Sequence, residues 1–248
     1  MTARWPTVAD VTVLSLDQSG AERIVPLAGA VAGSLVQGTP VRQFRMHKGQ
    51  PHWSGQWWCA TTCDLETYES RLELARLVLA DHDPLVVDLL SQPFTLRTKI
   101  GPKVRRHIPD FLLLRDDGHG TVVDVKPAHR VDDPKIAFTF DWTRRVVEAH
   151  GWDYEVWTGA PDTLLLNTRF LAAYRDERRV HPDAAQAVAA TAVAGLTVGR
   201  AIDLAEALGV HRALVKPAVL HLLWTGAFTA DLHRPLSNAT LLLPGRAL

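Results

Sequence analysis

The chain has 248 residues, of which 47% are hydrophobic, and this is enough apolar material for one large domain or for a medium domain and a small one. Its 27 lysines and arginines balance 27 aspartates and glutamates, a zero net charge that argues against a solitary, tight DNA binder. No apolar run reaches membrane-spanning length and no signal-peptide pattern begins the chain, so we expect a cytoplasmic protein without a membrane partner.

The N-terminal residues carry no catalytic signal. Short strand-like pieces at residues 11–16 and 24–27 are separated by glycine-containing turns, which predicts a β-rich extension. The two cysteines, Cys59 and Cys63, are too few for a disulfide framework, and no further ligands stand near them to complete a zinc site. We expect both thiols to be reduced.

Residues 42–58 mix cations with three tryptophans, Trp53, Trp57 and Trp58. Basic residues interleaved with aromatic ones can bind a nucleic-acid backbone and stack on bases. A tryptophan-rich edge that packs on a core has the same composition and is the more common case. Both interpretations stay open on the sequence.

Residues 65–80 have the apolar periodicity of a helix, which the polar residues 81–84 end. Glu66 falls in the first turn, where the helix dipole favours a negative charge. Glu69 and Glu73 are four residues apart and therefore share a helix face, where like charges repel unless one of them points at a cation.

Two apolar segments, residues 108–114 and 121–128, predict a β-hairpin, since the polar stretch between them contains the Gly and Asp residues of a hairpin turn. Asp110 and Asp124 interrupt these apolar strands, and a buried carboxylate is costly unless it is paired or bound to a cation. Because side chains alternate along a strand, Asp124 and Lys126 should project from the same face.

Four cations stand just upstream of this hairpin, and all are placed where they could meet the phosphates of a nucleic acid. An equally good interpretation is that these cations simply line a strand that faces solvent and bind no phosphate. The four are Lys99, Lys103, Arg105 and Arg106.

After the hairpin, residues 134–150 predict a helix and residues 152–158 a strand. The order helix, strand, strand, helix, strand is that of an α/β domain with a mixed central sheet flanked by helices. A further helical piece at residues 167–178 ends in a charged run, and we place the domain boundary there, which gives domains at 1–179 and 180–248.

Residues 180–248 are rich in Ala and Leu and predict a small winged helix-turn-helix domain. Thr197 caps one helix, Gly209 makes the turn, and a second helix covers about residues 212–224. Pro217 must lie near the start of that helix or kink it. Residues 226–231 and 240–243 suggest two wing strands. Because the second helix offers few cations, protein docking is at least as good an interpretation as base reading.

The motif Pro109-Asp110, followed by Asp124 and Lys126 with the second aspartate 14 residues after the first, resembles the PD-(D/E)xK nuclease superfamily, whose fold is restriction-endonuclease-like. A surface Asp-Lys pair is the alternative for the motif alone. Further matching blocks follow in one order, at residues 70–75, 83–88, 92–94, 109–111 and 123–128. Over about residues 42–178 the chain resembles TnsA, the endonuclease subunit of heteromeric transposases.

This resemblance implies roles for individual residues. Glu73 matches the helix glutamate of the family, with Glu69 as the alternative, Asp110 its metal-binding aspartate, and Lys126 its catalytic lysine. Asp124 stands where the best-known member has glutamine, a departure towards the ordinary restriction-enzyme pattern. It bears on how metal is shared between the two acidic positions, because a carboxylate binds a hard cation more strongly than an amide does.

The chemistry expected of these groups is phosphodiester hydrolysis with Mg²⁺ or Mn²⁺. The metal would be held through oxygen atoms, the ligands that hard cations prefer. These oxygens would come from Glu73, Asp110, Asp124 and the carbonyl of Val125. Lys126 would orient the attacking hydroxide and neutralise charge that develops on the phosphate.

The resemblance implies cleavage of the 5′ ends of a transposon, the strands that are not transferred, during cut-and-paste DNA transposition. A separate DDE-type transposase would process the 3′ ends, an AAA+ ATPase would regulate the assembly, and the protein would associate with the nucleoid when it acts. Two alternatives remain open. One is a stand-alone restriction or repair endonuclease, and the other is a DNA-binding winged-helix regulator with a vestigial nuclease core.

Overall fold

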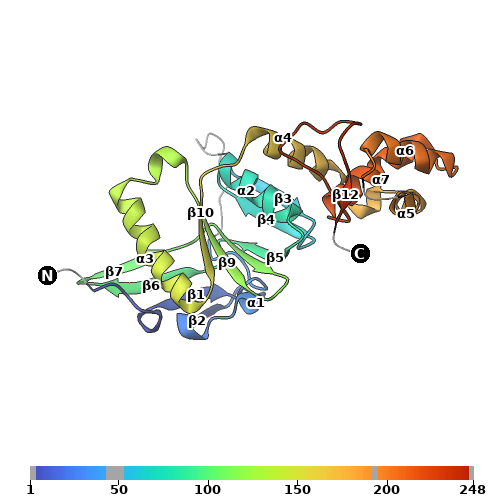
Figure 1. Ribbon diagram of the computed structural model, residues 1–248. Coiled ribbons are helices and arrows are strands. Elements are labelled where there is room, and N and C mark those ends of the chain that lie inside the picture. The colour runs from blue at the N-terminus through green and yellow to red at the C-terminus, as the bar shows by residue number, and fades with distance from the viewer. Residues whose placement is uncertain (1–3, 43–52, 192–194, 246–248) are drawn as a thin grey trace. The chain divides into compact units, whose positions relative to one another are not determined.

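The computed structural model describes residues 4–42, 53–191 and 195–245, and the chain divides into two compact units (Figure 1). The first unit comprises residues up to Leu77 together with Leu85–Gly159, and the second comprises Val78–Pro84 and the residues from Ala160 onwards. The expected boundary after residue 179 therefore lies inside the second unit, because helix α4 (Asp162–Leu171) packs with helix α7 (Arg212–Trp224).

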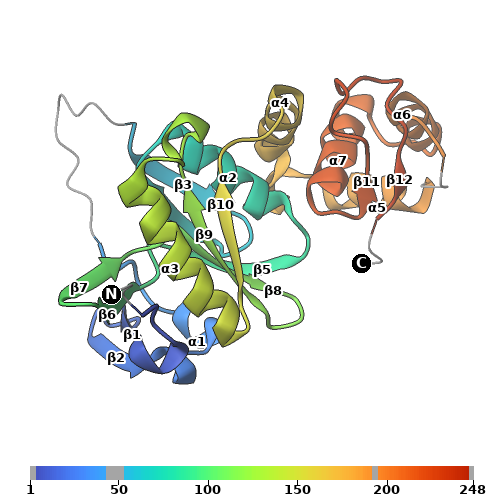
Figure 2. The ribbon, with the colours of Figure 1, turned by 60° about the vertical axis from the view of Figure 1, so that its left-hand side comes forward.

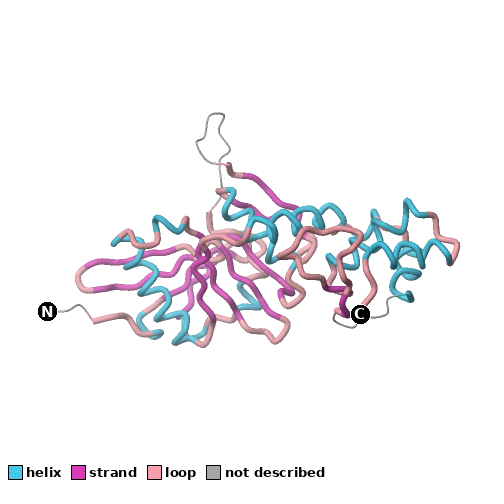
Figure 3. Tube along the Cα trace, turned by 45° about the horizontal axis from the view of Figure 1, so that its top comes forward, coloured by secondary structure: helices cyan, strands magenta, loops and turns pink. Residues whose placement is uncertain are grey.

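The first unit holds most of the strands of the molecule, and the second is mainly helical (Figure 3). The strands of the first unit are β1 (Thr12–Leu16), β2 (Glu22–Pro26), β3 (Gly55–Cys59), β4 (Asp64–Tyr68), β5 (Val86–Ser91), β6 (Thr95–Ile100), β7 (Lys103–His107), β8 (Phe111–Arg115), β9 (Gly120–Val125) and β10 (Asp153–Trp157). Its helices are the single turn α1 (Ala32–Leu35), α2 (Arg71–His82), whose last turn belongs to the second unit, and α3 (Pro134–His150).

A mixed sheet with strand order β10-β9-β8-β5 forms the centre of the first unit. The predicted hairpin is confirmed as the antiparallel pair β8 and β9, and Gly118 adopts a φ of 82° in its turn, where a side chain would be strained. β10 pairs in parallel with β9, and helix α3 provides the crossover connection that a parallel pair needs. The mixed α/β architecture is thus the one expected.

The N-terminal strands join a second four-stranded sheet, with order β2-β1-β6-β7. The two predicted N-terminal strands are confirmed, and β1 pairs antiparallel with β6, so the extension is fixed to a hairpin inserted between β5 and β8. One hydrophobic core joins both sheets to α3: Val13 and Leu96 of the second sheet, Val122 of the first, and Trp142 and Val146 of the helix are all fully or almost fully buried.

Helices α2 and α3 contact opposite faces of the mixed sheet (Figure 2). Tyr154 and Glu155 are successive residues of β10 and therefore point to opposite sides. The guanidinium of Arg144 in α3 lies 4.9 Å from the centre of the Tyr154 ring, whereas Arg76 in α2 forms an ion pair of 2.7 Å with Glu155. The alternation along β9 then puts Asp124 on the α3 side of the sheet.

The predicted helix over residues 65–80 begins later than expected, at Arg71. Residues 64–68 form β4 and pair with β3, so the interpretation of Glu66 as a charge in the first helical turn is wrong. Its side chain is only 6% exposed and accepts hydrogen bonds from the amide and the hydroxyl of Ser91. Burial raises the pKa of Glu66.

The second unit contains α4, α5 (Pro182–Thr191), α6 (Val198–Ala207), α7 and a two-stranded sheet of β11 (Phe228–Thr229) and β12 (Leu243–Pro244). The Thr197 hydroxyl accepts a hydrogen bond from the amide of Arg200 and caps α6, as predicted. Gly209, with a φ of 90°, makes the turn before α7. Pro217 lies inside α7 and not at its start. The predicted helical piece at 167–178 begins earlier, at Asp162, and continues beyond Leu171 only as short 3-10 turns.

Other sequence predictions have simple outcomes. Among residues 4–42, 53–191 and 195–245, no helix is both long and apolar enough to cross a membrane. Cys59 is buried, Cys63 is exposed, and neither forms a disulfide bond, as expected. Much of the cationic, tryptophan-rich segment falls on residues 43–52, outside the described part of the chain; of the rest, Trp53 is 67% exposed and stacks under Arg71.

Candidate active site

Asp110 lies at the junction of the mixed sheet and the inserted hairpin, just before β8. Its Oδ2 accepts a short hydrogen bond of 2.6 Å from the amide of Val125 at the end of β9. Burial raises the pKa of Asp110 well above its usual value, and the charges of Asp124 and Glu73 raise it further. Asp110 is therefore a partly buried carboxylate that is influenced by the charges of both Asp124 and Glu73.

Asp124 is held from two sides by side chains that no sequence motif singles out. It is 2% exposed, and both of its carboxylate oxygens lie within 2.9 Å of Nε2 of His107. The hydroxyl of Tyr154 donates a hydrogen bond to Oδ2. Burial, followed by the charge of Asp124, raises the pKa of Tyr154 and keeps its hydroxyl proton in place as a donor.

No local pattern could identify His107 and Tyr154, since they are 17 and 30 residues from Asp124 along the chain. The available signal was indirect: an aspartate inside an apolar strand needs partners, and strands that approach it are where they must be sought. Trp142 of α3 meets the ring of His107 edge to face at 6.3 Å between centroids, which helps to fix the orientation of the imidazole.

Glu73 reaches the site from the first turn of α2. It forms a capping arrangement, in which its carboxylate accepts hydrogen bonds from the Glu69 amide at 2.6 Å and the Ser70 hydroxyl at 2.9 Å, while its own amide donates to Ser70. Arg76 is three residues later on the same helix face and binds β10, so this face is turned towards the sheet. Burial raises the pKa of Glu73, the charge of Glu69 adds to the rise, and Lys126 opposes it.

Glu69 is not on the helix, contrary to the expectation that it shares a face with Glu73. It precedes α2, and its carboxylate accepts a hydrogen bond of 3.0 Å from Gln92 and forms an ion pair of 3.2 Å with Arg42. The Glu69 carboxylate is thus engaged by Gln92 and Arg42, whereas Glu73 is the glutamate whose charge acts on Asp110.

Lys126 immediately follows β9, and its amide donates to the carbonyl of Trp157, which extends the parallel ladder by one residue. Its positive charge lowers the pKa values of both Glu73 and Asp110, so the ammonium lies near these two carboxylates. The charges of Glu73, Asp124 and Lys126 all act on the pKa of Asp110, and the assignment of these four residues to one active site stays a prediction.

The four predicted phosphate-binding cations divide between two faces of the β6–β7 hairpin. Lys99 and Arg106 are exposed on the outer face of the sheet. Lys103 and Arg105 alternate onto the other face, and the Arg105 guanidinium lies over the ring of Phe138 in α3, 4.8 Å from its centre. Arg105 is thereby engaged in packing against α3.

The three predicted acidic ligands offer carboxylate oxygens, the donor type that hard divalent cations prefer. Among the described residues, no group of three or more His, Cys, Asp or Glu side chains has the arrangement of a complete metal centre. The carboxylates of Asp110, Asp124 and Glu73 nevertheless lie close enough to raise the pKa of Asp110, a repulsion that a cation would relieve. Each carboxylate already accepts hydrogen bonds, yet a carboxylate has about four lone-pair sites and can accept a metal as well.

Comparison with known proteins identifies the segment that contains three of these four groups. Residues 83–159 match the family model of the TnsA-like endonuclease N terminal domain. The match includes Asp110, Asp124 and Lys126 and begins after Glu73. No curated protein matches the chain.

The contact between Tyr154 and Asp124 predicts a measurable coupling. Tyr154→Phe should lower the free energy of unfolding by about 1–3 kcal/mol, because a buried carboxylate loses one of its donors. In a cycle with Asp124→Asn, the two changes should be non-additive by at least about 0.5 kcal/mol in urea denaturation. Tyr174→Phe in the second unit is the matched control. Additive effects would show that this hydrogen bond does not couple the two side chains.

Proposed function

We propose that this chain, which carries a TnsA-like endonuclease domain of the PD-(D/E)xK type, hydrolyses phosphodiester bonds in DNA at the ends of a transposon. It would cleave the 5′ ends, on the strands that are not transferred, as one subunit of a heteromeric transposase that also contains a DDE-type transposase and an AAA+ regulator. The observation that supports the proposal is the match of residues 83–159 to the TnsA-like endonuclease domain, together with the contact of Asp110 with the end of β9, the strand that carries Asp124.

The residues divide the chemistry among them. Mg²⁺ or Mn²⁺ would be held by Asp110, Asp124, Glu73 and the carbonyl of Val125. When bound, the metal would lower the pKa of a water molecule and polarise the scissile phosphate. His107 and Tyr154 keep Asp124 in one orientation. Val125 does the same for Asp110 through its amide.

Lys126 supplies the positive charge that the reaction needs. Its ammonium is close to Glu73 and Asp110, so it can orient an attacking water and neutralise negative charge as it grows on the phosphate oxygens. The pKa of Glu73 is raised by burial, which makes this carboxylate a better proton acceptor than an exposed one.

The second unit fits a role in assembly. Its α6, Gly209 turn, α7 and the β11–β12 ribbon follow the order of a winged helix-turn-helix, and we propose that classification for it. Arg212, at the start of α7, forms ion pairs with Asp203 and Glu206 of α6. With that cation already paired, protein docking is favoured over base reading.

Removal of the central groups should abolish cleavage. Asp110→Ala and Lys126→Ala should each lower the rate of Mg²⁺-dependent nicking of transposon-end DNA by about 10² or more, since both act on charge in the transition state. Asp124→Ala should behave in the same way.

The controls for this test are Asp132→Ala and Lys135→Ala, which remove charges of the same kind from exposed positions. Circular dichroism and urea denaturation establish that each variant is folded. Near-normal nicking by Asp110→Ala in a folded protein would overturn the assignment of the site.

The two glutamates next to α2 should differ in effect. Glu73→Gln keeps the helix cap, because glutamine can replace glutamate in a capping box, but removes the charge that faces Asp110 and Lys126. Its nicking rate should fall by about 10². Glu69→Gln should retain activity within a few-fold. The reverse result would mean that Glu69 enters the site when DNA is bound.

Charge predicts dependence on partners. A chain of zero net charge has little long-range attraction for a polyanion, so alone it should bind and cut DNA weakly, whereas docking raises its effective concentration at the transposon end. We expect nicking by the full-length protein to rise at least about tenfold when the products of the adjacent transposase and ATPase genes are added.

Two other outcomes would redirect the assignment. Robust site-specific cleavage by the protein alone would favour a stand-alone restriction or repair endonuclease. Site-specific binding with no cleavage, in the presence of Mg²⁺ or Mn²⁺ and both partners, would favour a DNA-binding regulator with a vestigial core. The Asp110→Ala protein, assayed in parallel, separates true nicking from a contaminating nuclease.

A further inference from the structure

The outer face of the β2-β1-β6-β7 sheet is cationic where β6 meets β7. Side chains alternate along β6, so Leu96 and Ile100 enter the core while Arg97 and Lys99 are exposed on the opposite face. Arg106 of β7 stands directly across from Arg97 in the antiparallel register. Like charges in such a cross-strand pair repel each other unless an anion lies between them.

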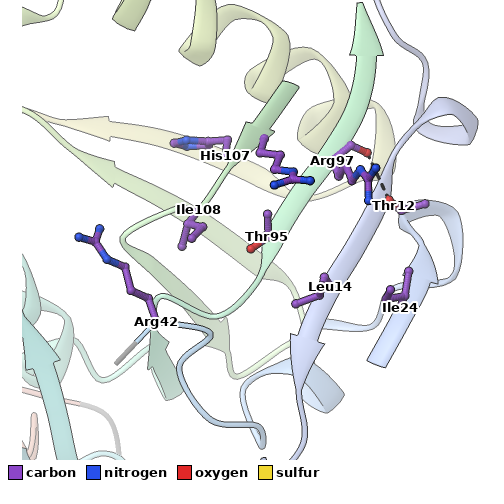
Figure 4. A pocket seen from close by; sticks show the side chains of 9 residues that line it. Thr12, Leu14, Ile24, Arg42, Thr95, Arg97, His107 and Ile108 are labelled. Atoms are coloured by element: carbon purple, nitrogen blue, oxygen red, sulfur yellow. Dashed lines mark hydrogen bonds between the residues drawn. The ribbon is translucent and has the colours of Figure 1, made fainter. Parts of the chain in front are cut away.

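Arg97 and Arg106 border an open groove with a volume of about 630 Å³. Figure 4 shows Arg97, Arg42 and His107 on different sides of it, with Thr95 and Ile24 also in its lining. Within the described part of the chain, no carboxylate lines the groove and none forms an ion pair with Arg97 or Arg106. The groove therefore has the charge of a site for an anion.

The groove adjoins the candidate active site through two contacts. His107 lines it and at the same time lies 2.8 Å from the carboxylate of Asp124. Arg42 lines it and forms its ion pair with Glu69, whose amide donates to Glu73. Two residues of the groove lining therefore each contact a carboxylate of the candidate site or next to it, Asp124 and Glu69.

We infer that this groove binds the phosphate backbone of double-stranded DNA next to the bond that is cut, and that Arg97 and Arg106 are its principal contacts. The inference rests on the proposed function and extends it to the path of the substrate. Guanidinium groups suit this role, because each can donate two parallel hydrogen bonds to one phosphate. Backbone contacts of this kind position the duplex without reading its sequence.

The inference also accounts for a protein that is neutral as a whole. Counterion release depends on the cations that touch phosphates and not on the total charge. A local group of arginines can therefore bind DNA although acidic residues elsewhere balance the count, 27 against 27. The weak affinity expected of so few contacts agrees with a need for partner subunits.

The test compares two double variants of the full-length protein. Arg97→Gln with Arg106→Gln removes the groove cations, whereas Lys135→Gln with Arg169→Gln removes the same charge from exposed positions that do not line the groove. The affinity for a fluorescent DNA duplex of roughly 30 base pairs is measured by anisotropy over a range of salt concentrations. EDTA is present throughout, so that no cleavage occurs.

The groove variant should bind at least about tenfold more weakly, and the slope of log K against log salt should decrease in magnitude by about 2, one for each phosphate that is no longer neutralised. The control should stay within about threefold of the unmodified protein, since its charges touch no phosphate. Equal weakening in both variants would overturn the inference, as would unchanged binding by the groove variant or no DNA binding by the unmodified protein.

A cleavage assay separates this inference from the proposed function. Asp110→Ala should bind the duplex at least as well as the unmodified protein while cutting nothing. If the groove variant loses binding but no condition yields Asp110-dependent cleavage, the groove stands and the endonuclease assignment fails. If the groove variant cuts DNA with unchanged kcat/KM, the endonuclease assignment stands and the groove fails.

Discussion

The placement of one buried carboxylate, Asp124, and of two partly buried ones, Asp110 and Glu73, is the constraint on which the first unit depends. Moving a carboxylate out of water costs several kcal/mol of free energy unless hydrogen-bond donors in the protein replace the water molecules that solvated it. Here the replacements come from four separate elements: the amide of Val125 for Asp110, the side chains of His107 and Tyr154 for Asp124, and Ser70 for Glu73. The cluster can form only after α2, β7, β9 and β10 have assembled, so the site and the fold are specified together.

That dependence explains which features were predictable from sequence. The β8–β9 hairpin, α3 and β10 follow from local patterns of apolar residues and turn chemistry, and the structure contains them with nearly the expected bounds. Strand β4 could not be found in this way, since the burial of Glu66 depends on Ser91, 25 residues later. The apolar periodicity of residues 65–80 predicted one helix, but its first residues form β4, because the contact of Glu66 with Ser91 outweighs the local pattern.

The candidate site shows the same division between local and distant information. The motif singles out Asp110, Asp124 and Lys126 because they lie on or next to the two arms of one hairpin, and the structure contains that hairpin, with Asp110 bonded to the amide of Val125 between the other two residues in sequence. Their supporting groups, His107 and Tyr154, come from strands of different sheets and carry no motif. The four upstream cations were grouped by sequence alone, whereas the alternation of β7 sends Arg105 towards Phe138 and Arg106 towards solvent.

Three consecutive residues of the inserted β6–β7 hairpin therefore have three different roles. Arg105 packs on α3 and fixes the hairpin to the core, Arg106 lines the cationic groove, and His107 supports Asp124. Since β6 also pairs with β1, the N-terminal extension holds this hairpin in place beside the carboxylates. A change in how the hairpin packs would move the groove and the support of Asp124 together. The extension thus has a physical role in the site although it contributes none of the acidic groups: it keeps the surface proposed to hold the DNA backbone in register with the groups proposed to cut it.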